Sequence, residues 1–306
     1  MKKKLSAIVL LFSLGLGLLG ASPINAAKTS NNNSYEINLD GAFIPLDVQP
    51  FVSHSSLLIP IRTLSPLGLS YSWNAASQTV TIKNPAGDVL TVTLNNKIAS
   101  KNGKSIEMAV PAQSKNGRVL VPIRFVSESM GYEVQHESIR DIIFVRSPDY
   151  ASNPGNPDQS DLVAARRAAI SLPITTDFKI LDFGRTKHYH SYTFPVGRAD
   201  MYEFFDSYIY TIVKIEDGKA IAIGQYTIGD RSNFSHKAGN ITGKNTSDPV
   251  LEPLLFGVNF YRHSNTSIIE ISYWEDPETE HRSMKSITNS GYKVYSDIIQ
   301  KVPNDL

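Results

Sequence analysis

Short apolar segments separated by glycine-bearing turns run through the first half of the chain, and one pattern occurs twice. Residues 57–68 return as residues 119–131, and Leu-Ile-Pro-Ile-Arg at 58–62 falls on Leu-Val-Pro-Ile-Arg at 120–124, an offset of 62 residues. One residue is gained within the following segment, so that the offset from Gly68 onward is 63. A self-match of this length predicts a structural unit that occurs twice.

Each copy of the pattern predicts a short strand followed by a short helix. Pro60 ends the apolar strand and suits a first helical turn, where its missing N–H leaves no donor unpaired. Ile61, Leu64 and Leu67 are three residues apart and share one helix face, and Gly68 ends the helix as its C-cap. The second copy has the same face and the same stop: Ile123, Val126, Met130 and Gly131.

Hairpin patterns flank both helices. Residues 35–39 alternate and run into Asp40-Gly41, a turn pair that predicts a β-hairpin. After the helices, residues 69–73 and 78–82 flank a turn, as do 132–136 and 141–145 in the second copy, and 88–94 is a further strand. We therefore expect two strand–helix–strand units, 35–94 and 95–147, each packing its helix on a sheet.

The remainder of the chain predicts a linker and a separate domain. Residues 148–160 are rich in Pro, Gly, Asn, Asp and Ser, as linkers are. A helix follows with Ser160 as its N-cap and Pro173 at its end, and a second helix is expected near 292–302. Strands are predicted at 178–183, 188–194, 208–215, 220–228, 258–261 and 267–273. The expected fold class is α+β, with the repeated units followed by an antiparallel α+β domain at 161–306.

The N-terminus and the composition indicate where the protein works. Three lysines at 2–4, an apolar run at 5–19 and small residues before position 26 are typical of a secretory signal peptide. Removing residues 1–26 takes three of the 30 basic residues and none of the 29 acidic ones, leaving a net charge of −2. No strong field remains, which argues against nucleic acid as the main partner. We expect a secreted protein, extracellular or associated with the cell wall, without a membrane span after cleavage.

Cysteine is absent from the chain. Its absence excludes disulfides, thiolate metal sites and a cysteine nucleophile together. The folded protein must therefore be held by its core alone.

The repeat resembles a known family. Ile-Asn-Leu-Asp-Gly at 37–41, the Leu-Ile-Pro-Ile-Arg core, the Leu-Gly helix end and the Trp73-Asn74 hairpin are similar to the stalk domain at the N-terminus of copper amine oxidases, over about residues 35–147. In the second copy His136-Glu137 replaces Trp73-Asn74, so this hairpin diverges more. The resemblance implies a non-catalytic accessory module of secreted Gram-positive proteins, without a cofactor. It does not imply amine oxidase activity, because the Asn-Tyr-Asp/Glu context of the quinone-forming tyrosine is absent.

Candidate binding residues lie in the second half of the chain. The polar stretch 229–248 has no periodicity, and its length indicates a functional insertion that offers Arg231, Lys237 and Lys244 to a partner. Aromatic residues concentrate between 189 and 210, and Tyr189 and Tyr192 are candidates for a sugar- or protein-binding platform; a buried core face is the alternative.

Metal and catalytic signals are weaker. His188 and His190 would place two imidazoles on one strand face, as zinc or copper sites need, but no third ligand has a diagnostic spacing. Acidic residues cluster after Trp274, from Glu275 to Glu280, where a solvated turn explains them as well as a glycosidase site does. We therefore predict no metal and no catalytic residue.

Three functions remain compatible with these patterns. The first is a non-catalytic binding protein whose C-terminal domain recognises an extracellular macromolecule, either a cell-wall polymer or a protein. The second is a secreted inhibitor of serine proteinases that presents the 229–248 loop, although an inhibitory loop must be rigid and no disulfide is available. The third is a cell-wall hydrolase that uses His188, His190 or the acids near Glu275.

Overall fold

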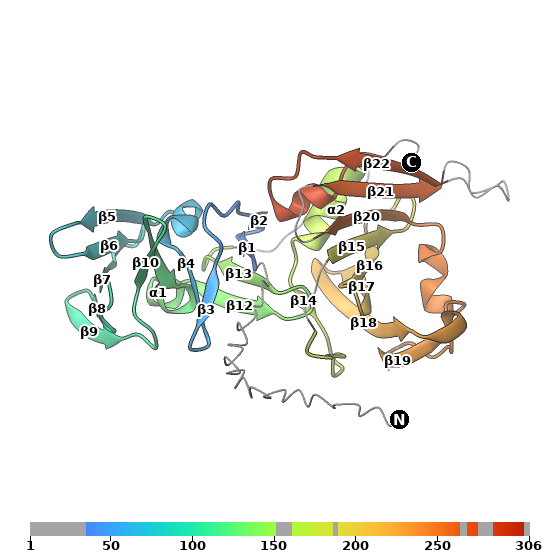
Figure 1. The fold of residues 1–306 in the computed structure, drawn as a ribbon, viewed down its shortest axis with the longest axis horizontal. Helices are drawn as coiled ribbons and strands as arrows, with labels where there is room; N and C mark the ends of the chain where they lie inside the picture. The colour runs from blue at the N-terminus through green and yellow to red at the C-terminus, as the bar shows by residue number, and fades with distance from the viewer. Residues whose placement is uncertain (1–34, 151–160, 186–188, 264–267, 275–283, 303–306) are drawn as a thin grey trace, which may run out of the picture. The chain divides into compact units, whose positions relative to one another are not determined.

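The computed structural model of the chain describes residues 35–150, 161–185, 189–263, 268–274 and 284–302 (Figure 1). All of them belong to one compact unit, 33–306. The predicted signal peptide and residues 151–160 of the predicted linker lie outside these ranges. Within them strands dominate, helices are few and several sheets form, which confirms a mixed α+β fold. No helix of the described ranges is long and apolar enough to cross a membrane.

The repeat region, residues 35–147, contains equivalent elements in the same order in both copies, with one extra strand between them. The first copy has β1 (Glu36–Leu39), β2 (Ala42–Phe43), β3 (Phe51–Ser53), β4 (Ser56–Pro60), η1 (Ile61–Leu67), β5 (Ser70–Asn74) and β6 (Thr79–Lys83). The second has β8 (Ile98–Lys101), β9 (Lys104–Glu107), β10 (Gln113–Lys115), β11 (Arg118–Pro122), α1 (Ile123–Ser129), β12 (Glu133–Glu137) and β13 (Ile142–Arg146). The extra strand is β7 (Val89–Thr93).

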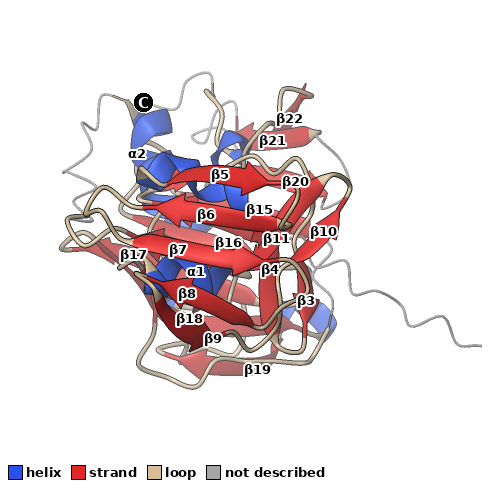
Figure 2. Ribbon diagram, turned by 90° about the vertical axis from the view of Figure 1, so that its left-hand side faces the viewer, coloured by secondary structure: helices blue, strands red, loops and turns tan. Residues whose placement is uncertain are grey.

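The two copies interlock through strand pairing. β4 and β11, which are equivalent by the offset of 62, pair antiparallel with each other, with Ile59 opposite Val121. β1 of the first copy pairs parallel with β13 of the second, with Ile37 opposite Ile143. The extra strand β7 lies between β6 of the first copy and β8 of the second copy and pairs antiparallel with both (Figure 2). Strand pairing therefore joins the predicted units 35–94 and 95–147, and both contribute to one hydrophobic cluster.

The predicted helix faces and helix ends are confirmed. Ile61, Leu64 and Leu67 of η1 are buried, and Gly68 follows with a φ of 76° in the left-handed region that favours glycine. The same holds for the buried face of α1 and for Gly131, whose φ is 88°. The first helix is a 3₁₀ helix and contains Pro66, which has no N–H to donate to a helical hydrogen bond.

The C-terminal region, residues 161–302, is built on one nine-stranded sheet. Its order is β14-β18-β17-β16-β15-β20-β21-β22, and β19 also pairs with β18. The strands are β14 (Ile174–Thr175), β15 (Tyr189–Phe194), β16 (Met201–Phe205), β17 (Tyr210–Glu216), β18 (Lys219–Ile228), β19 (Phe234–Gly239), β20 (Val258–His263), β21 (Ile269–Trp274) and β22 (Met284–Asn289). The helices are α2 (Leu162–Ile170), η2 (Asp230–Ser232), η3 (Pro249–Leu254) and η4 (Tyr295–Ile298).

The strands predicted for the C-terminal region differ from the structure at several places. Residues 178–183 form no strand; the N–H of Leu181 donates to the side-chain Oε1 of Gln225 at 2.7 Å, so it is not part of a strand ladder. β16 was not predicted, because Tyr202 and Phe204 are buried on one face and Met201 on the other, which removes the polar alternation of a half-buried strand. β22 was not predicted either.

The loop and helix assignments also change. The polar stretch 229–248 is not irregular throughout, because β19 pairs with β18, with Lys237 opposite Tyr226. The helical pattern near 292–302 produces only η4, after which Ile299 is extended. The N-cap of α2 is Asp161 and not Ser160: the Asp161 carboxylate accepts a hydrogen bond from the N–H of Ala164 at 3.0 Å.

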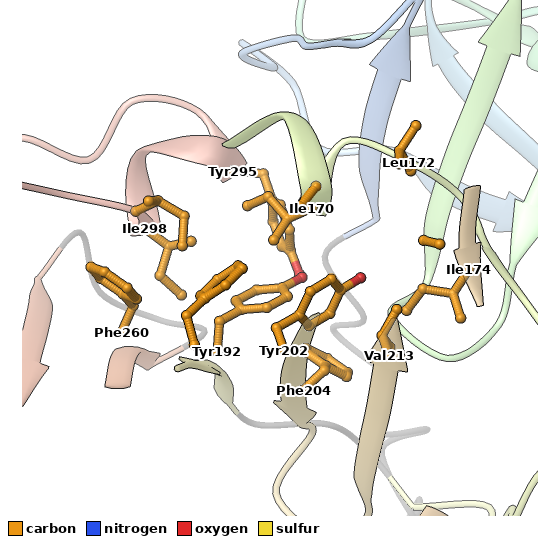
Figure 3. Packing of buried hydrophobic residues seen from close by; sticks show 14 of the residues in the cluster. Ile170, Leu172, Ile174, Tyr192, Tyr202, Phe204, Val213, Phe260, Tyr295 and Ile298 are labelled. Atoms are coloured by element: carbon orange, nitrogen blue, oxygen red, sulfur yellow. The ribbon is translucent and has the colours of Figure 1, made fainter. Parts of the chain in front are cut away.

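One face of the large sheet carries the main core. Tyr192, Tyr202, Phe204 and Phe260 are fully buried there and pack with Tyr295 of η4 (Figure 3). The hydroxyls of Tyr192 and Tyr295 are 2.6 Å apart and share a hydrogen bond. The same cluster includes four residues of the repeat region: Phe43, Ile139, Ile142 and Phe144. The hydrophobic core therefore extends from the C-terminal sheet into the second hairpin of the repeat.

A buried ion pair accompanies this shared core. Arg140, in the turn between β12 and β13, donates from Nε to Glu137 Oε2 at 2.5 Å, and neither side chain is more than 2 % exposed. Its two other nitrogens donate to the carbonyls of Ile170 and Leu172, each at 2.7 Å, at the C-terminal end of α2. Burial disfavours the charge, yet the Glu137 carboxylate keeps the pKa of Arg140 above its ordinary value.

Candidate functional site

The face of the C-terminal sheet opposite the main core is only partly covered; we call it the open face. Neighbouring residues on a strand point to opposite faces, so Ser191 and Phe205 lie on the open face while Tyr192 and Phe204 lie in the core. Strand register places one continuous row of directly paired residues across this face: Glu270, Tyr261, Ser191, Phe205, Tyr210 and Tyr226.

Part of this row is a stack of aromatic rings from three adjacent strands, β16, β17 and β18. The rings of Phe205 and Tyr210 are stacked with centroids 4.2 Å apart, and those of Tyr210 and Tyr226 are nearly parallel at 4.8 Å. Phe234 of β19 continues the stack, 4.6 Å from Tyr226. Such cross-strand ring pairs hold the strands in register and keep the rings rigid. The next residue of the row after Phe205 is Ser191.

Polar side chains form the neighbouring row. Asn259 donates from Nδ2 to Thr193 Oγ1 at 2.9 Å, and Thr193 lies opposite Glu203 in the strand register. Glu203 is partly buried and accepts a hydrogen bond from the hydroxyl of Tyr226 at 2.5 Å. Burial raises the pKa of Glu203 to about 7, and this hydrogen bond opposes the rise. Near neutral pH the carboxyl group can therefore either donate or accept.

The segment after β19 covers one end of the open face. Ile241, Leu251 and Leu254 pack with Met201, Ile212 and Tyr226 in a second cluster. Gly224 makes room for this segment, since a Cβ there would lie 2.7 Å from Cγ1 of Ile241. Phe205, Tyr210 and Tyr261 lie beyond this cover and are partly exposed. The open face therefore offers rings beside a carboxyl and an amide.

The structure separates the two aromatic candidates. Tyr192 is fully buried in the main core, so its ring forms no surface platform and the core alternative applies to it. Tyr189 lies at the start of β15, opposite His263, and its side chain lies outside the described residues. Binding by Tyr189 stays a prediction.

The three basic candidates lie around β19 but have different surroundings. Lys237 donates from its ammonium to the carbonyls of Thr242 and Gly243, at 2.9 and 2.7 Å, so its charge is held by its own loop. Arg231 is exposed in η2 with a φ of 53°, and Lys244 is exposed near the edge of β19. Of the three, Lys237 is directly paired with Tyr226 of the aromatic stack in the strand register.

The metal candidates are not assembled within the described ranges. The ring of His190 packs among core aromatics, 5.4 Å from Phe204 and 5.7 Å from Tyr295. His188 and the acids from Glu275 to Glu280 lie outside the described residues. Among the residues described, no group of three or more His, Cys, Asp or Glu is placed to hold a metal ion.

The sequence did not single out Glu203, Asn259 or Thr193, and of the stack only Phe205 and Tyr210 belonged to the aromatic group noted between 189 and 210. The aromatic residues concentrated between 189 and 210 do include part of the site. They belong, however, to two sets that alternate along the strands and lie on opposite faces of the sheet. Knowing that Tyr202 and Phe204 face the core would have assigned Phe205 to the opposite face. Tyr226 and Phe234 come close to this set only through the sheet order.

Comparison with known proteins concerns the repeat region alone. The family model described as copper amine oxidase N-terminal domain matches residues 38–145, which confirms the resemblance seen in the repeat. In copper amine oxidases this domain is a non-catalytic accessory domain. A search of curated proteins found no match. The C-terminal half has no family match, so similarity to the copper amine oxidase N-terminal domain covers residues 38–145 alone.

Proposed function

We propose that this chain is a secreted, non-catalytic binding protein whose open face recognises a polysaccharide of the cell wall. The observation that carries the proposal is the stack of Phe205, Tyr210 and Tyr226 beside the carboxyl of Glu203. Sugar rings present C–H groups to aromatic side chains and hydroxyl groups to carboxyl and amide groups. The open face supplies both kinds of partner on a rigid sheet.

The copper amine oxidase N-terminal domain would serve as the accessory part of such a protein. It shares a core with the C-terminal region and pairs Arg140 with the end of α2. This attachment supports a binding domain that is held firmly, rather than one that moves independently on a linker. The proposed location, outside the cell membrane and at the wall, is the one expected from the N-terminal pattern.

The first test is binding of the mature chain, residues 27–306, to purified cell-wall sacculi. Tyr210→Leu keeps apolar volume but removes the central ring of the stack, and we expect it to weaken binding about tenfold or more. The matched control is Trp73→Ala, which removes an aromatic ring that is 47 % exposed in the repeat region. Equal binding by wild type and Tyr210→Leu, with both folded, would contradict the proposal, as would failure of the wild type to bind.

The pH dependence of binding tests the role of Glu203. Its carboxyl group changes from donor to acceptor as the pH passes about 7, so wild-type affinity should change across that pH while Glu203→Gln stays flat. A parallel profile for both proteins would remove Glu203 from the site.

Stability should change with pH at the same group. The folded-state pKa of Glu203 lies above its ordinary 4.5, so its contribution is complete below pH 4.5 and is lost as the pH rises towards about 7. Relative to Glu203→Gln, the wild type should lose at most about 3 kcal/mol of unfolding free energy over this window. Urea unfolding at pH 4 and pH 8 measures the difference.

Proteinase inhibition is the alternative, and one observation favours it. The tip between β18 and β19 is constrained, because the N–H of Gly229 donates to Asn233 O at 2.7 Å and the exposed Arg231 lies between them. The left-handed backbone of Arg231, however, differs from the extended conformation that a proteinase cleft accepts. Titration of trypsin with the mature chain decides this: stoichiometric loss of activity would support inhibition, and cleavage of the chain would exclude it.

A further inference from the structure

A groove of about 470 Å³ lies in the repeat region, away from the open face. It is bounded by the β3–β4 hairpin, by the first turns of α1 and by β12 and β13. Its buried lining is apolar and includes Ile123, Val134 and Ile143, and the ring of Phe125 also lines it. Exposed Arg124 and Glu128 belong to its outer part. The volume lies within the range of roughly 300–1,000 Å³ typical of ligand sites.

The internal repeat provides a second copy of this place for comparison. By the offset of 62, Ser56 and Ala109 of the groove correspond to Arg118 and Asp47. Arg118 donates from Nε to Asp47 Oδ2 at 2.7 Å. The Arg118–Asp47 ion pair therefore spans the place that is equivalent to the groove. In the groove itself the hydroxyl group of Ser56 and the methyl group of Ala109 leave this space open.

Two further positions differ in the same direction. By the offset of 63, Val134 and His136 of the groove correspond to Tyr71 and Trp73. The hydroxyl of Tyr71 is hydrogen-bonded to Ser65, so its ring is fixed beside η1. Strand pairing of β5 with β6 matches that of β12 with β13, with Trp73 opposite Val80 and His136 opposite Ile143. Smaller side chains on an equivalent backbone therefore open the groove.

We propose that this groove binds the aromatic side chain of an extended peptide segment from another protein. At the corresponding positions the other copy carries two aromatic rings of its own, the partly buried Tyr71 and the 47 % exposed Trp73. The groove lacks the Arg118–Asp47 charges, so its interior complements a neutral ring, and Phe125 adds a ring where the other copy has Thr63.

The opening of the groove complements a peptide backbone. Arg124 and Glu128 form an exposed ion pair, with Nη1 and Oε1 3.1 Å apart, and they provide one cation for a carbonyl and one anion for an N–H. β3 is the edge strand of its sheet, and its Val52, 51 % exposed, lines the groove. An edge strand can pair with an added extended segment, which places alternate side chains of that segment on the groove side.

The test titrates the mature chain with acetylated, amidated Gly-Trp-Gly and Gly-Ala-Gly and measures heat or amide chemical-shift changes. We expect the tryptophan peptide to bind about tenfold more tightly or better. Free N-acetyltryptophanamide tests whether the peptide backbone contributes to binding. If this small amide binds as tightly as the tryptophan peptide, the backbone contributes nothing and the peptide assignment is overturned. Equal binding of the two peptides would overturn the aromatic assignment.

Variants taken from the other copy locate the binding. Ser56→Arg with Ala109→Asp imports the ion pair and should reduce binding about tenfold or more, as should Val134→Tyr with His136→Trp. The matched control is Arg118→Ser with Asp47→Ala, which changes the equivalent positions but leaves Tyr71 and Trp73 in place and should keep binding unchanged. Unaltered binding by both closing variants, each with wild-type circular dichroism, would overturn the groove as the site.

Discussion

The two hairpins that end the two copies of the repeat have the same turn but different surroundings. In the first copy, Asn74 Oδ1 accepts hydrogen bonds from the N–H groups of Ala76 and Ser77, at 3.0 and 3.2 Å. In the second, Glu137 occupies the position of Asn74 and its Oε1 accepts from the N–H of Arg140 at 2.9 Å, the equivalent of Ser77. The residues that follow, Gln78 and Asp141, both have positive φ.

What differs is the set of side chains on the turn. The first copy carries exposed, small Ala75, Ala76 and Ser77, and the second carries buried Ile139 and Arg140. Ile139 belongs to the main core, and Arg140 binds the last carbonyls of α2, where the helix dipole favours a cation. The comparison teaches that one turn geometry can serve as a solvent-exposed end or as the join to another region. The divergence of His136-Glu137 from Trp73-Asn74 accompanies this change.

The largest expected effect comes from Arg140→Ala. The change leaves Glu137 buried without its partner and removes the donors of two carbonyls, so we expect a loss of about 3–5 kcal/mol. Urea unfolding followed at Trp73 and Trp274, the only tryptophans, measures it on both sides of the join. Ser77→Ala, at the equivalent position, should stay within about 0.5 kcal/mol. Similar losses for the two variants would break the comparison.

Ile139→Ala tests the apolar part of the join. Ile139 is 6 % exposed and lies in the main core, so removing its side-chain atoms should cost about 2–3 kcal/mol. Ala76→Ser, on the equivalent exposed turn residue, serves as the control and should change the unfolding free energy by less than about 0.5 kcal/mol. A loss below that limit for Ile139→Ala would show that the turn is not packed as described.

Replacing the whole ion pair sharpens the comparison further. Glu137→Leu with Arg140→Met leaves no unpaired buried charge, although the carbonyls of Ile170 and Leu172 lose their donors and the N–H of residue 140 loses its acceptor. We therefore expect a loss of about 1–2 kcal/mol, smaller than that of Arg140→Ala alone. The same urea titration decides the order, and a double variant less stable than Arg140→Ala would show that the pair is favourable as a unit.

The smallest expected effect concerns the exposed turn. Asn74→Ala removes the side-chain acceptor of the first turn, whose counterpart in the second turn is Glu137. The change should cost about 0.5–1 kcal/mol of unfolding free energy, because the freed N–H groups can bind water. Ser72→Ala on β5, an exposed strand residue, is the control. Thermal unfolding of both variants gives the difference, and a loss as large as that of Arg140→Ala would mean that exposure does not separate the two turns.

Prediction from sequence succeeded where neighbouring residues decide the outcome. The helix stops at Gly68 and Gly131 and the helix faces three residues apart follow from local backbone conformation and side-chain spacing. It failed for residues 178–183, where the Gln225 side chain accepts a hydrogen bond from the backbone of Leu181. It also failed for Tyr192, whose ring lies in the core and not on a binding surface. Both outcomes depend on residues far away in the chain.

The sequence alone determined that one pattern occurs twice, where its short helices begin and end, and that residues 38–145 are similar to the copper amine oxidase N-terminal domain. Those properties depend on local conformation and on a pattern that repeats at a constant offset. Only the tertiary structure decided which aromatic residues between 189 and 210 enter the core, that Arg140 meets the end of α2, and that one of two equivalent places in the repeat stays open. These depend on burial and on pairing between distant strands, which a single sequence leaves undetermined.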